Sequence, residues 1–228
     1  MRAATSAMGT IRRMRDSVCM LLFAKAPVPG TVKTRLAKSI GDAAAAGVYR
    51  AMARHCIDIA YAAFSDDVEV WCTPDRRHPF FDECAAGRTI SLRDQAQGGL
   101  GERMGHAFKD ALERVSSALL MGTDVPSIST EDLRAAARSL QAGKDAVMIP
   151  TEDGGYGLIG LRAYDERAFI DIDWGTPDVM SQTRQRFSAI GWDWLELPVR
   201  WDVDEPRDLA RLANLPGFAA IAGAINKR

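Results

Sequence analysis

The sequence has few cysteines and histidines, and none of them is arranged as a soft-metal site. Its 228 residues include 4 cysteines and 3 histidines, and no two cysteines form a Cys-x-x-Cys pair. This spacing excludes a zinc-finger type of site and a disulfide framework, and it favours free thiols in a reducing compartment, the cytoplasm. A bound metal would then be a hard cation held by oxygen ligands, such as Mg²⁺ or Mn²⁺.

The chain also lacks a long apolar run and a marked excess of charge. No stretch approaches the ~20 apolar residues that a membrane helix needs. Lysine and arginine number 29 and aspartate and glutamate 30, so the formal net charge is -1. We therefore expect neither a nucleic acid nor a membrane as partner. Basic residues before the apolar run at 18–24 leave a secretory signal as an alternative, which we disfavour because cleavage would remove the first core strand.

Apolar patterns of strand and helix type alternate along the chain. The continuous apolar run at 18–24 predicts a buried strand, and apolar residues at helical spacing predict a helix over 42–64. Further strands are expected at 68–72, 118–121, 146–149 and 195–197, and further helices at 104–115, 129–140, 176–191 and from 206 onward. This alternation is typical of an α/β fold with one doubly wound, mostly parallel (mixed) sheet and helices on both faces. We expect a flexible N-terminal extension over 1–16 and a single domain over 17–228.

The loop after the first strand is rich in cationic and turn-forming residues. Residues 25–35 are Lys-Ala-Pro-Val-Pro-Gly-Thr-Val-Lys-Thr-Arg. Gly30 lets the backbone approach a ligand, while Lys25, Lys33 and Arg35 place positive charge around one spot, as a diphosphate requires. Ligands of open α/β sheets bind beyond the carboxyl ends of the strands, which favours this interpretation over a solvated basic loop. The spacing is not that of a Walker loop.

Two acidic motifs can supply oxygen ligands for a cation. Asp124 directly follows the strand expected at 118–121, so its carboxylate can face a metal ion or a ribose. Asp202 and Asp204 point the same way if their segment is extended. The alternatives are an ordinary turn for Asp124 and a helix N-cap for Asp204, and for the latter reason we rank Asp202 slightly ahead of Asp204 as a ligand.

A glycine-rich motif, Asp153-Gly-Gly-Tyr-Gly157, follows the strand at 146–149. Its paired glycines permit close approach of a ligand, Asp153 can accept hydrogen bonds from sugar hydroxyls, and Tyr156 offers a stacking face. Asp-Gly is also a strong signal for a β-hairpin turn. The two interpretations are compatible.

Taken in order, these motifs resemble the nucleotide-diphospho-sugar transferase superfamily, whose fold is the glycosyltransferase-A (GT-A) fold. Within it they are most similar to a bacterial branch of radical-SAM/selenodomain-associated or arsenosugar-type glycosyltransferases. The likeness runs from about residue 18 to about residue 212. It is carried by residues 24–36, 95–104, 122–126, 153–160 and 202–209.

The resemblance implies a transferase that uses a nucleotide-activated donor, most directly a glycosyltransferase moving a sugar from a nucleotide-diphosphate sugar to a small acceptor with Mg²⁺ or Mn²⁺. The residues it assigns to nucleotide and phosphate binding are Lys25, Pro29, Gly30, Lys33, Thr34, Arg35, Gln95 and Arg103. It assigns catalysis to Asp124 and Asp153, and the metal ion to Asp124, Asp202 and Asp204. The acceptor pocket would be lined by Gly154, Gly155, Tyr156 and Trp174.

The chain departs from the family pattern at two places. Gly99 stands where the branch typically carries an aspartate, and Asp124 lacks the Asp-x-Asp pair common among glycosyltransferases of this fold. Two alternatives stay open. One is a nucleotidyltransferase that moves a guanylyl or cytidylyl group from a nucleoside triphosphate to a phosphorylated acceptor and releases pyrophosphate. The other is a non-catalytic nucleotide-binding module. The sequence also leaves a homodimer open.

Overall fold

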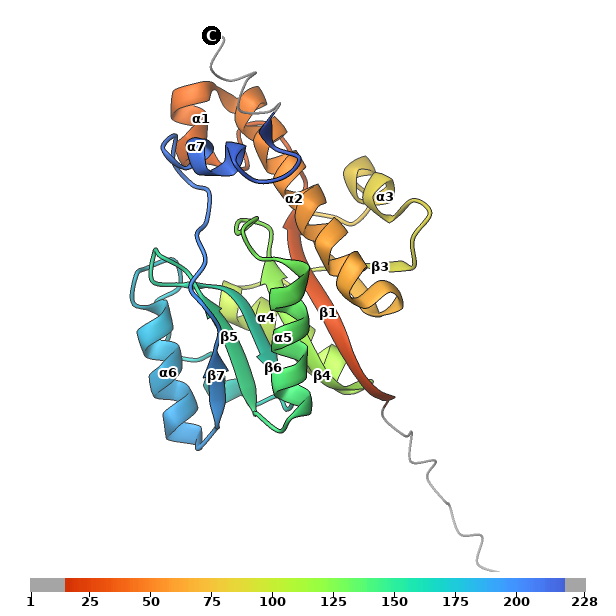
Figure 1. Cartoon of the computed structure of the whole chain (residues 1–228), viewed down its shortest axis with the longest axis vertical. Coiled ribbons are helices and arrows are strands. Elements are labelled where there is room, and N and C mark those ends of the chain that lie inside the picture. The colour runs from red at the N-terminus through yellow and green to blue at the C-terminus, as the bar shows by residue number, and fades with distance from the viewer. Residues whose placement is uncertain (1–14, 220–228) are drawn as a thin grey trace, which may run out of the picture.

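A computed structural model describes residues 15–219, which form a seven-stranded sheet in the order β3-β2-β1-β4-β6-β5-β7 (Figure 1). The strands are β1 (Arg15–Lys25), β2 (Val68–Thr73), β3 (Ile90–Asp94), β4 (Val115–Gly122), β5 (Ala146–Pro150), β6 (Tyr156–Leu161) and β7 (Trp194–Glu196). β6 runs antiparallel to β4 and β5, and the other neighbouring strands pair in parallel. The predicted mostly parallel, mixed sheet is confirmed.

Helices cover both faces of this sheet. They are α1 (Thr34–Ile40), α2 (Asp42–Phe64), α3 (Pro79–Ala85), α4 (Leu100–Leu112), α5 (Thr130–Gln141), α6 (Val179–Ile190) and α7 (Asp208–Ala213). One hydrophobic cluster joins α2, α3 and α5 to one face, and a second joins α4 and α6 to the other. Figure 1 shows α2 and α5 in front of the strands and α4 behind them.

The central strand β1 explains why the apolar run at its core is continuous. Met20 and Leu22 belong to the cluster under α2 and α5, whereas Cys19 and Leu21 belong to the cluster under α4. Successive side chains of a strand point to opposite faces, so a strand with helices on both sides needs apolar residues at every position.

A third, smaller cluster lies beyond the carboxyl end of β1, where Figure 1 shows α1 and α7 side by side. Leu36 of α1, Met52 of α2 and Leu212 of α7 pack there around Val203. This packing brings the segment before α7 against the loop after β1.

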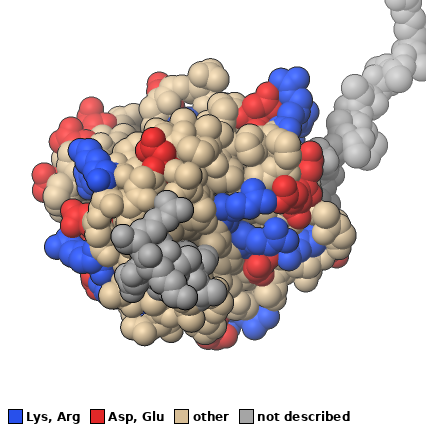
Figure 2. Space-filling view, turned by 90° about the horizontal axis from the view of Figure 1, so that it is seen from above, with Lys and Arg blue, Asp and Glu red and all other residues tan. Residues whose placement is uncertain are grey.

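Figure 2 views the molecule from this end, and basic and acidic side chains lie close together on the face it shows.

Several predicted boundaries were wrong. Val115 begins β4 and does not end a helix, because its buried side chain packs with α4 and so mimics helical spacing. α6 begins at Val179, since Thr176 and Pro177 form a preceding turn in which Asp178 N–H donates to Thr176 Oγ1. The last helix begins at Asp208, two residues after Pro206. The sequence patterns also missed α1, α3, β3 and β6.

Other predictions hold within the described range. The helix over 42–64 is confirmed as α2, and the capping box before α5 forms as expected, with Ser129 Oγ accepting from Asp132 N–H. β1 starts at Arg15, so residues 15 and 16 of the predicted extension belong to the strand, while residues 1–14 lie outside the described residues. No helix in the described part of the chain is long and apolar enough to cross a membrane.

Candidate functional site

A cavity of about 520 Å³ lies at the carboxyl ends of β1 and β4, as expected for an open α/β sheet. Its wall includes four cationic side chains and two carboxylates, an excess of two positive charges: Lys25, Lys33, Arg35 and Arg103, with Asp124 and Asp204. Thr34, Gln95 and Tyr156 line it as well. The cavity thus gathers nine of the residues assigned from the sequence and suits an anionic ligand.

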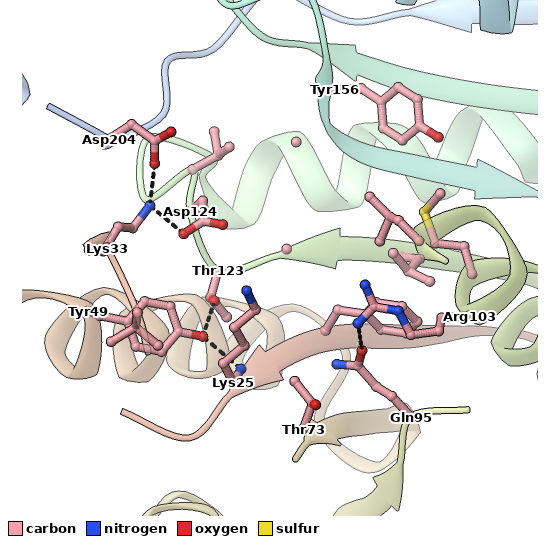
Figure 3. Close-up of a pocket in the computed structure, with 18 of the residues that line it drawn as sticks. Lys25, Lys33, Tyr49, Thr73, Gln95, Arg103, Thr123, Asp124, Tyr156 and Asp204 are labelled. Carbon is pink, nitrogen blue, oxygen red and sulfur yellow. Dashed lines mark hydrogen bonds and ion pairs between the residues drawn. The ribbon is translucent and has the colours of Figure 1, made fainter. Parts of the chain in front are cut away.

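Lys33 links the loop after β1 to two carboxylates from distant parts of the chain (Figure 3). Its Nζ lies 2.5 Å from Asp124 Oδ1 and 3.0 Å from Asp204 Oδ1. The Lys33 side chain is 3% exposed, whereas those of Asp124 and Asp204 are 56% and 42% exposed. Burial acts to lower the pKa of Lys33, but the two carboxylates outweigh it and the pKa is raised above its usual value. Lys33 is therefore a cation at neutral pH.

The backbone of Lys33 adopts a left-handed conformation at the N-cap of α1, with φ 47° and ψ 47°. This conformation costs a non-glycine residue on the order of 1 kcal/mol and persists only where surrounding contacts compensate. Here the ion pairs and the packing of α1 supply those contacts. Arg35, one residue into α1, is mostly exposed and places its Nη1 3.6 Å from Asp204 Oδ2.

Tyr49 of α2 joins the loops that follow β1 and β4. Its buried hydroxyl accepts a hydrogen bond from Lys25 N–H (2.7 Å) and lies 2.9 Å from Thr123 Oγ1. Burial, followed by the charge of Asp124, raises the pKa of Tyr49, so the hydroxyl stays neutral. Sequence reasoning missed this residue because it lies in the apolar stripe of α2. The available signal was a tyrosine in a core stripe, since a buried tyrosine hydroxyl usually finds a polar partner.

The other side of the cavity presents hydrogen-bond donors (Figure 3). Arg103 Nη1 donates to Gln95 Oε1 at 2.8 Å, and Gln95 Nε2 donates to Trp71 O at 2.8 Å. Within the described residues, Arg103 Nε is buried and has no hydrogen-bond partner. A bound ligand would therefore meet donors here and would have to offer acceptors.

The comparisons with known proteins fit this geometry. Residues 57–176 match the family model described as "Uncharacterized protein conserved in bacteria (DUF2064)". The chain belongs to the DUF2064 family. The matched range runs from within α2 to the turn before α6, and so it includes Arg103 and Asp124 but not Lys33.

The DUF2064 protein is also similar to solved structures. One is a protein from Desulfovibrio desulfuricans G20 whose own assignment as a nucleotide-diphospho-sugar transferase is a prediction. Its sequence is 31% identical to this chain, the match covers 92% of this chain and 94% of that chain, and the TM-score is 0.81. A nucleotidyl transferase from Methanothermobacter is 12% identical (89% and 98% covered, TM-score 0.62). Glucosyl-3-phosphoglycerate synthase from Mycobacterium tuberculosis, in complex with Mn²⁺, UDP and glucosyl-3-phosphoglycerate, is 11% identical (92% and 80% covered, TM-score 0.53). No curated protein matches the chain.

These similarities place the DUF2064 protein in the nucleotide-diphospho-sugar transferase superfamily, as its motifs predict, with a GT-A-like fold. The two structures with low identity establish the fold and leave the reaction open.

Some predicted residues lie outside the wall of the cavity in the DUF2064 protein. They are Pro29, Gly30, Asp153, Gly154, Gly155, Trp174 and Asp202. Pro29 and Gly30 form an exposed turn in which Thr31 N–H donates to Val28 O, and Gly30 supplies the positive φ of 82° that such a turn needs. Their contribution is to the shape of the loop.

The glycine-rich motif forms the hairpin turn between β5 and β6. Asp153 Oδ1 accepts hydrogen bonds from Thr151 Oγ1 (2.5 Å) and Gly155 N–H (3.2 Å), both within the turn. Gly154 has φ 90°, and a Cβ there would overlap the backbone of Pro177. The hairpin is therefore packed against the turn before α6. Trp174 contacts the Tyr156 ring edge-on with centroids 6.3 Å apart.

Asp202 and Asp204, the acidic residues before α7, lie in different environments. Asp204 faces Lys33, and Asp208 Oδ2 accepts hydrogen bonds from the N–H groups of Asp204 and Glu205. The expected N-cap role of Asp204 is wrong, because the N-cap residue of α7 is Arg207, which makes no side-chain cap hydrogen bond. Asp202 is half-buried, and burial followed by the nearby charge of Asp153 raises its pKa to about 6. The geometry thus favours Asp204 over Asp202 as the partner of Asp124.

Gly99, the departure from the branch pattern, is the N-cap residue of α4 and does not line the cavity. Its N–H donates to Glu102 Oε2 at 2.7 Å. An aspartate at this position would sit at the start of a helix, where it would accept backbone hydrogen bonds. The absence of a carboxylate at position 99 therefore affects the start of α4, and not the wall of the cavity.

Proposed function

We propose that the DUF2064 protein is a transferase that binds a nucleotide-activated donor in the cavity at the ends of β1 and β4. The most direct form of this proposal is a glycosyltransferase that takes a nucleotide-diphosphate sugar and passes the sugar to a small acceptor. One observation carries it: Lys25, Lys33 and Arg35 converge on one cavity with a carboxylate pair. A diphosphate that leaves water needs such donors to replace its hydration.

In this reaction an acceptor hydroxyl attacks the anomeric carbon of the donor, the bond from that carbon to the diphosphate oxygen breaks, and the nucleoside diphosphate leaves. Lys33 and its cationic neighbours would stabilise the negative charge that grows on the leaving group. The proton of the acceptor hydroxyl passes to a base. Asp153 was predicted for this role and stays a prediction, because its carboxylate lies outside the cavity wall and is hydrogen-bonded within its own turn.

Asp124 and Asp204 fit a divalent cation by the chemistry of their donor atoms. Mg²⁺ is commonly held by one or two carboxylates together with substrate phosphates, and these two carboxylates lie at the wall of one cavity. No group of three or more ligating side chains occurs within residues 15–219, so phosphate oxygens would have to complete the site. Bound Mg²⁺ or Mn²⁺ would neutralise charge on the diphosphate.

Nucleotidyl transfer is the second candidate. There a phosphate oxygen of the acceptor attacks the α-phosphorus of a nucleoside triphosphate, and pyrophosphate leaves. The same cationic wall suits a triphosphate, and the similar fold of the Methanothermobacter nucleotidyl transferase supports keeping this reaction in view. The two reactions differ in their products.

A thermal-shift screen of the purified protein tests the proposal. Nucleotide sugars and nucleoside triphosphates are each added with and without Mg²⁺ or Mn²⁺. A ligand at ~100 times its Kd adds roughly 2.7 kcal/mol to the free energy of unfolding, which gives a clear rise in Tm. Metal-dependent stabilisation by a nucleotide sugar supports glycosyl transfer, and preference for a triphosphate with pyrophosphate release supports nucleotidyl transfer. Absence of any response contradicts both reactions.

Binding in this screen, without release of a nucleoside diphosphate or pyrophosphate in a separate product assay, would favour the non-catalytic alternative. The cytoplasmic location, the single domain over 17–228 and a homodimer stay predictions.

A further inference from the structure

The ammonium group of Lys33 lies between the two carboxylates that would have to hold a divalent cation. Its Nζ is 2.5 Å from Asp124 Oδ1 and 3.0 Å from Asp204 Oδ1. Mg²⁺ approaches carboxylate oxygens to ~2.0–2.1 Å. A metal ion on these two oxygens would thus be in close contact with the ammonium group, and both are positively charged. Lys33 and the metal ion cannot use the pair in this arrangement at the same time.

The charges of this group explain why Lys33 competes effectively. The two carboxylates carry two negative charges, which Lys33 and the mostly exposed Arg35 balance, and of these two cations only Lys33 contacts both carboxylates with an almost fully buried side chain. A buried ammonium group that loses its partners is strongly destabilised. Lys33 will therefore leave the carboxylates only for another anion or for water outside the pocket.

Lys33 is also well placed to leave. It stands at the N-cap of α1 on the wall of the cavity, with the flexible four-carbon stem of a lysine. The same wall carries Lys25 and Arg35, so an anion bound there would offer Lys33 a new partner.

We propose that Lys33 is the resident cation of the Asp124–Asp204 pair and competes with divalent cations for it. The part of this inference that concerns phosphate rests on the proposed function, whereas the competition itself does not. It follows that a metal ion alone binds weakly, and that metal and diphosphate strengthen each other's binding, because the diphosphate pairs with the displaced Lys33.

The direct test is Mn²⁺ binding without nucleotide, followed by the electron paramagnetic resonance signal of free Mn²⁺. Lys33→Met keeps the length of the buried chain and removes its charge. We expect it to bind Mn²⁺ about tenfold more tightly than the wild type, since the site gains a full negative charge at contact distance. Lys33→Met/Asp124→Asn should lose this gain, which locates the ion at the pair.

Lys38→Met is the matched control, because Lys38 is an exposed residue of the same short helix. It removes an equal charge away from the carboxylates and should change Mn²⁺ affinity by less than about twofold. Equal affinity of Lys33→Met and the wild type overturns the inference, as does an equal gain in Lys38→Met.

A second measurement uses only the wild-type protein and so does not depend on how a variant folds. The buried Lys33 ammonium should be acylated slowly by an amine-reactive reagent, as measured by mass spectrometry. Mn²⁺ at a concentration that fills the site should raise the labelling of Lys33 several-fold and leave that of Lys38 unchanged. Unchanged Lys33 labelling overturns the inference. Neither measurement contains a nucleotide, so failure of the nucleotide screen and failure of this inference are separate results.

Discussion

The loop after β1 and the hairpin between β5 and β6 both place polar residues just beyond a strand, yet they use them differently. Lys33 in the first loop pairs with Asp204, 171 residues away, and with Asp124. Asp153 in the hairpin bonds to Thr151 and Gly155, each two residues away. A loop between parallel strands must travel and meets other loops at the sheet edge, whereas a tight hairpin can satisfy its polar groups internally.

The largest expected effect tests whether the hairpin is a structural element. Gly154→Ala should lower the free energy of unfolding by about 3 kcal/mol, because the added methyl group combines a left-handed backbone with overlap on Pro177. Gly143→Ala is the control, since Gly143 also has a positive φ, 109°, but no atom near its would-be Cβ. It should cost only about 1 kcal/mol by chemical denaturation. Equal losses in the two variants would show that packing against Pro177 does not matter.

The next effect concerns the tie between the loops after β1 and β4. Tyr49→Phe leaves Lys25 N–H without its acceptor and Thr123 without its hydroxyl partner, so it should destabilise the protein by about 2 kcal/mol. Thermal or urea unfolding measures the change. Tyr61→Phe, on the same helix with its ring against Arg88, serves as control and should stay within about 0.5 kcal/mol. A loss in Tyr49→Phe no greater than in the control would remove Tyr49 from its bridging role.

A smaller effect separates the two loops by function. Asp124→Asn should weaken nucleotide binding in the presence of Mn²⁺ by about tenfold, or about 1.4 kcal/mol, and abolish its dependence on the metal. Asp153→Asn makes the matched change in the hairpin and should leave the metal dependence intact. Isothermal titration with and without Mn²⁺ measures both. If only Asp153→Asn loses metal dependence, the site lies at the hairpin and the assignment of Asp124 is wrong.

The smallest effect concerns the helix terminus at Gly99. Gly99→Asp restores an N-cap side chain to α4 and should stabilise the protein by about 0.3 kcal/mol without changing nucleotide binding. Gly98→Asp, one residue earlier, should destabilise it, because Gly98 has φ 108° and a Cβ there would collide with Glu102. Differential scanning calorimetry measures the change in stability of both variants. A large gain in nucleotide affinity for Gly99→Asp would instead make Gly99 part of the site.

Much of the fold could be predicted because strands and helices in each layer have a characteristic spacing of apolar residues in the sequence. β1 is covered on both faces and is apolar without interruption over residues 18–24, while α2 has a single core stripe and was predicted with its observed ends. The elements α1, α3 and β3, which are short or lie at the sheet edge, were missed, and so was the central strand β6. The edge strand β3 has only partly buried and exposed residues, and α1 has seven residues with one of them fully buried, so neither shows a clear period.

The candidate site could be predicted in part for a similar reason. Lys33 and Asp124 are polar residues that follow strands, where a ligand site of this fold class is expected, whereas Arg103 was assigned from the family resemblance. Tyr49 could not be distinguished from core residues of its stripe. The choice between Asp202 and Asp204 depended on the fold before α7, where Arg207 is the N-cap residue and the Asp204 carboxylate pairs with Lys33.

By itself the sequence determined the alternation of strands and helices, the continuous apolar core of β1 and the cationic character of the loop that follows it, because these are properties of neighbouring residues. Only the tertiary structure decided that Lys33 lies between Asp124 and Asp204. Those contacts join segments up to 171 residues apart, and their geometry is set by how α1, α2 and α7 pack around Val203. No local pattern encodes such a distance, so the partners of a charged residue emerge only when the chain has folded.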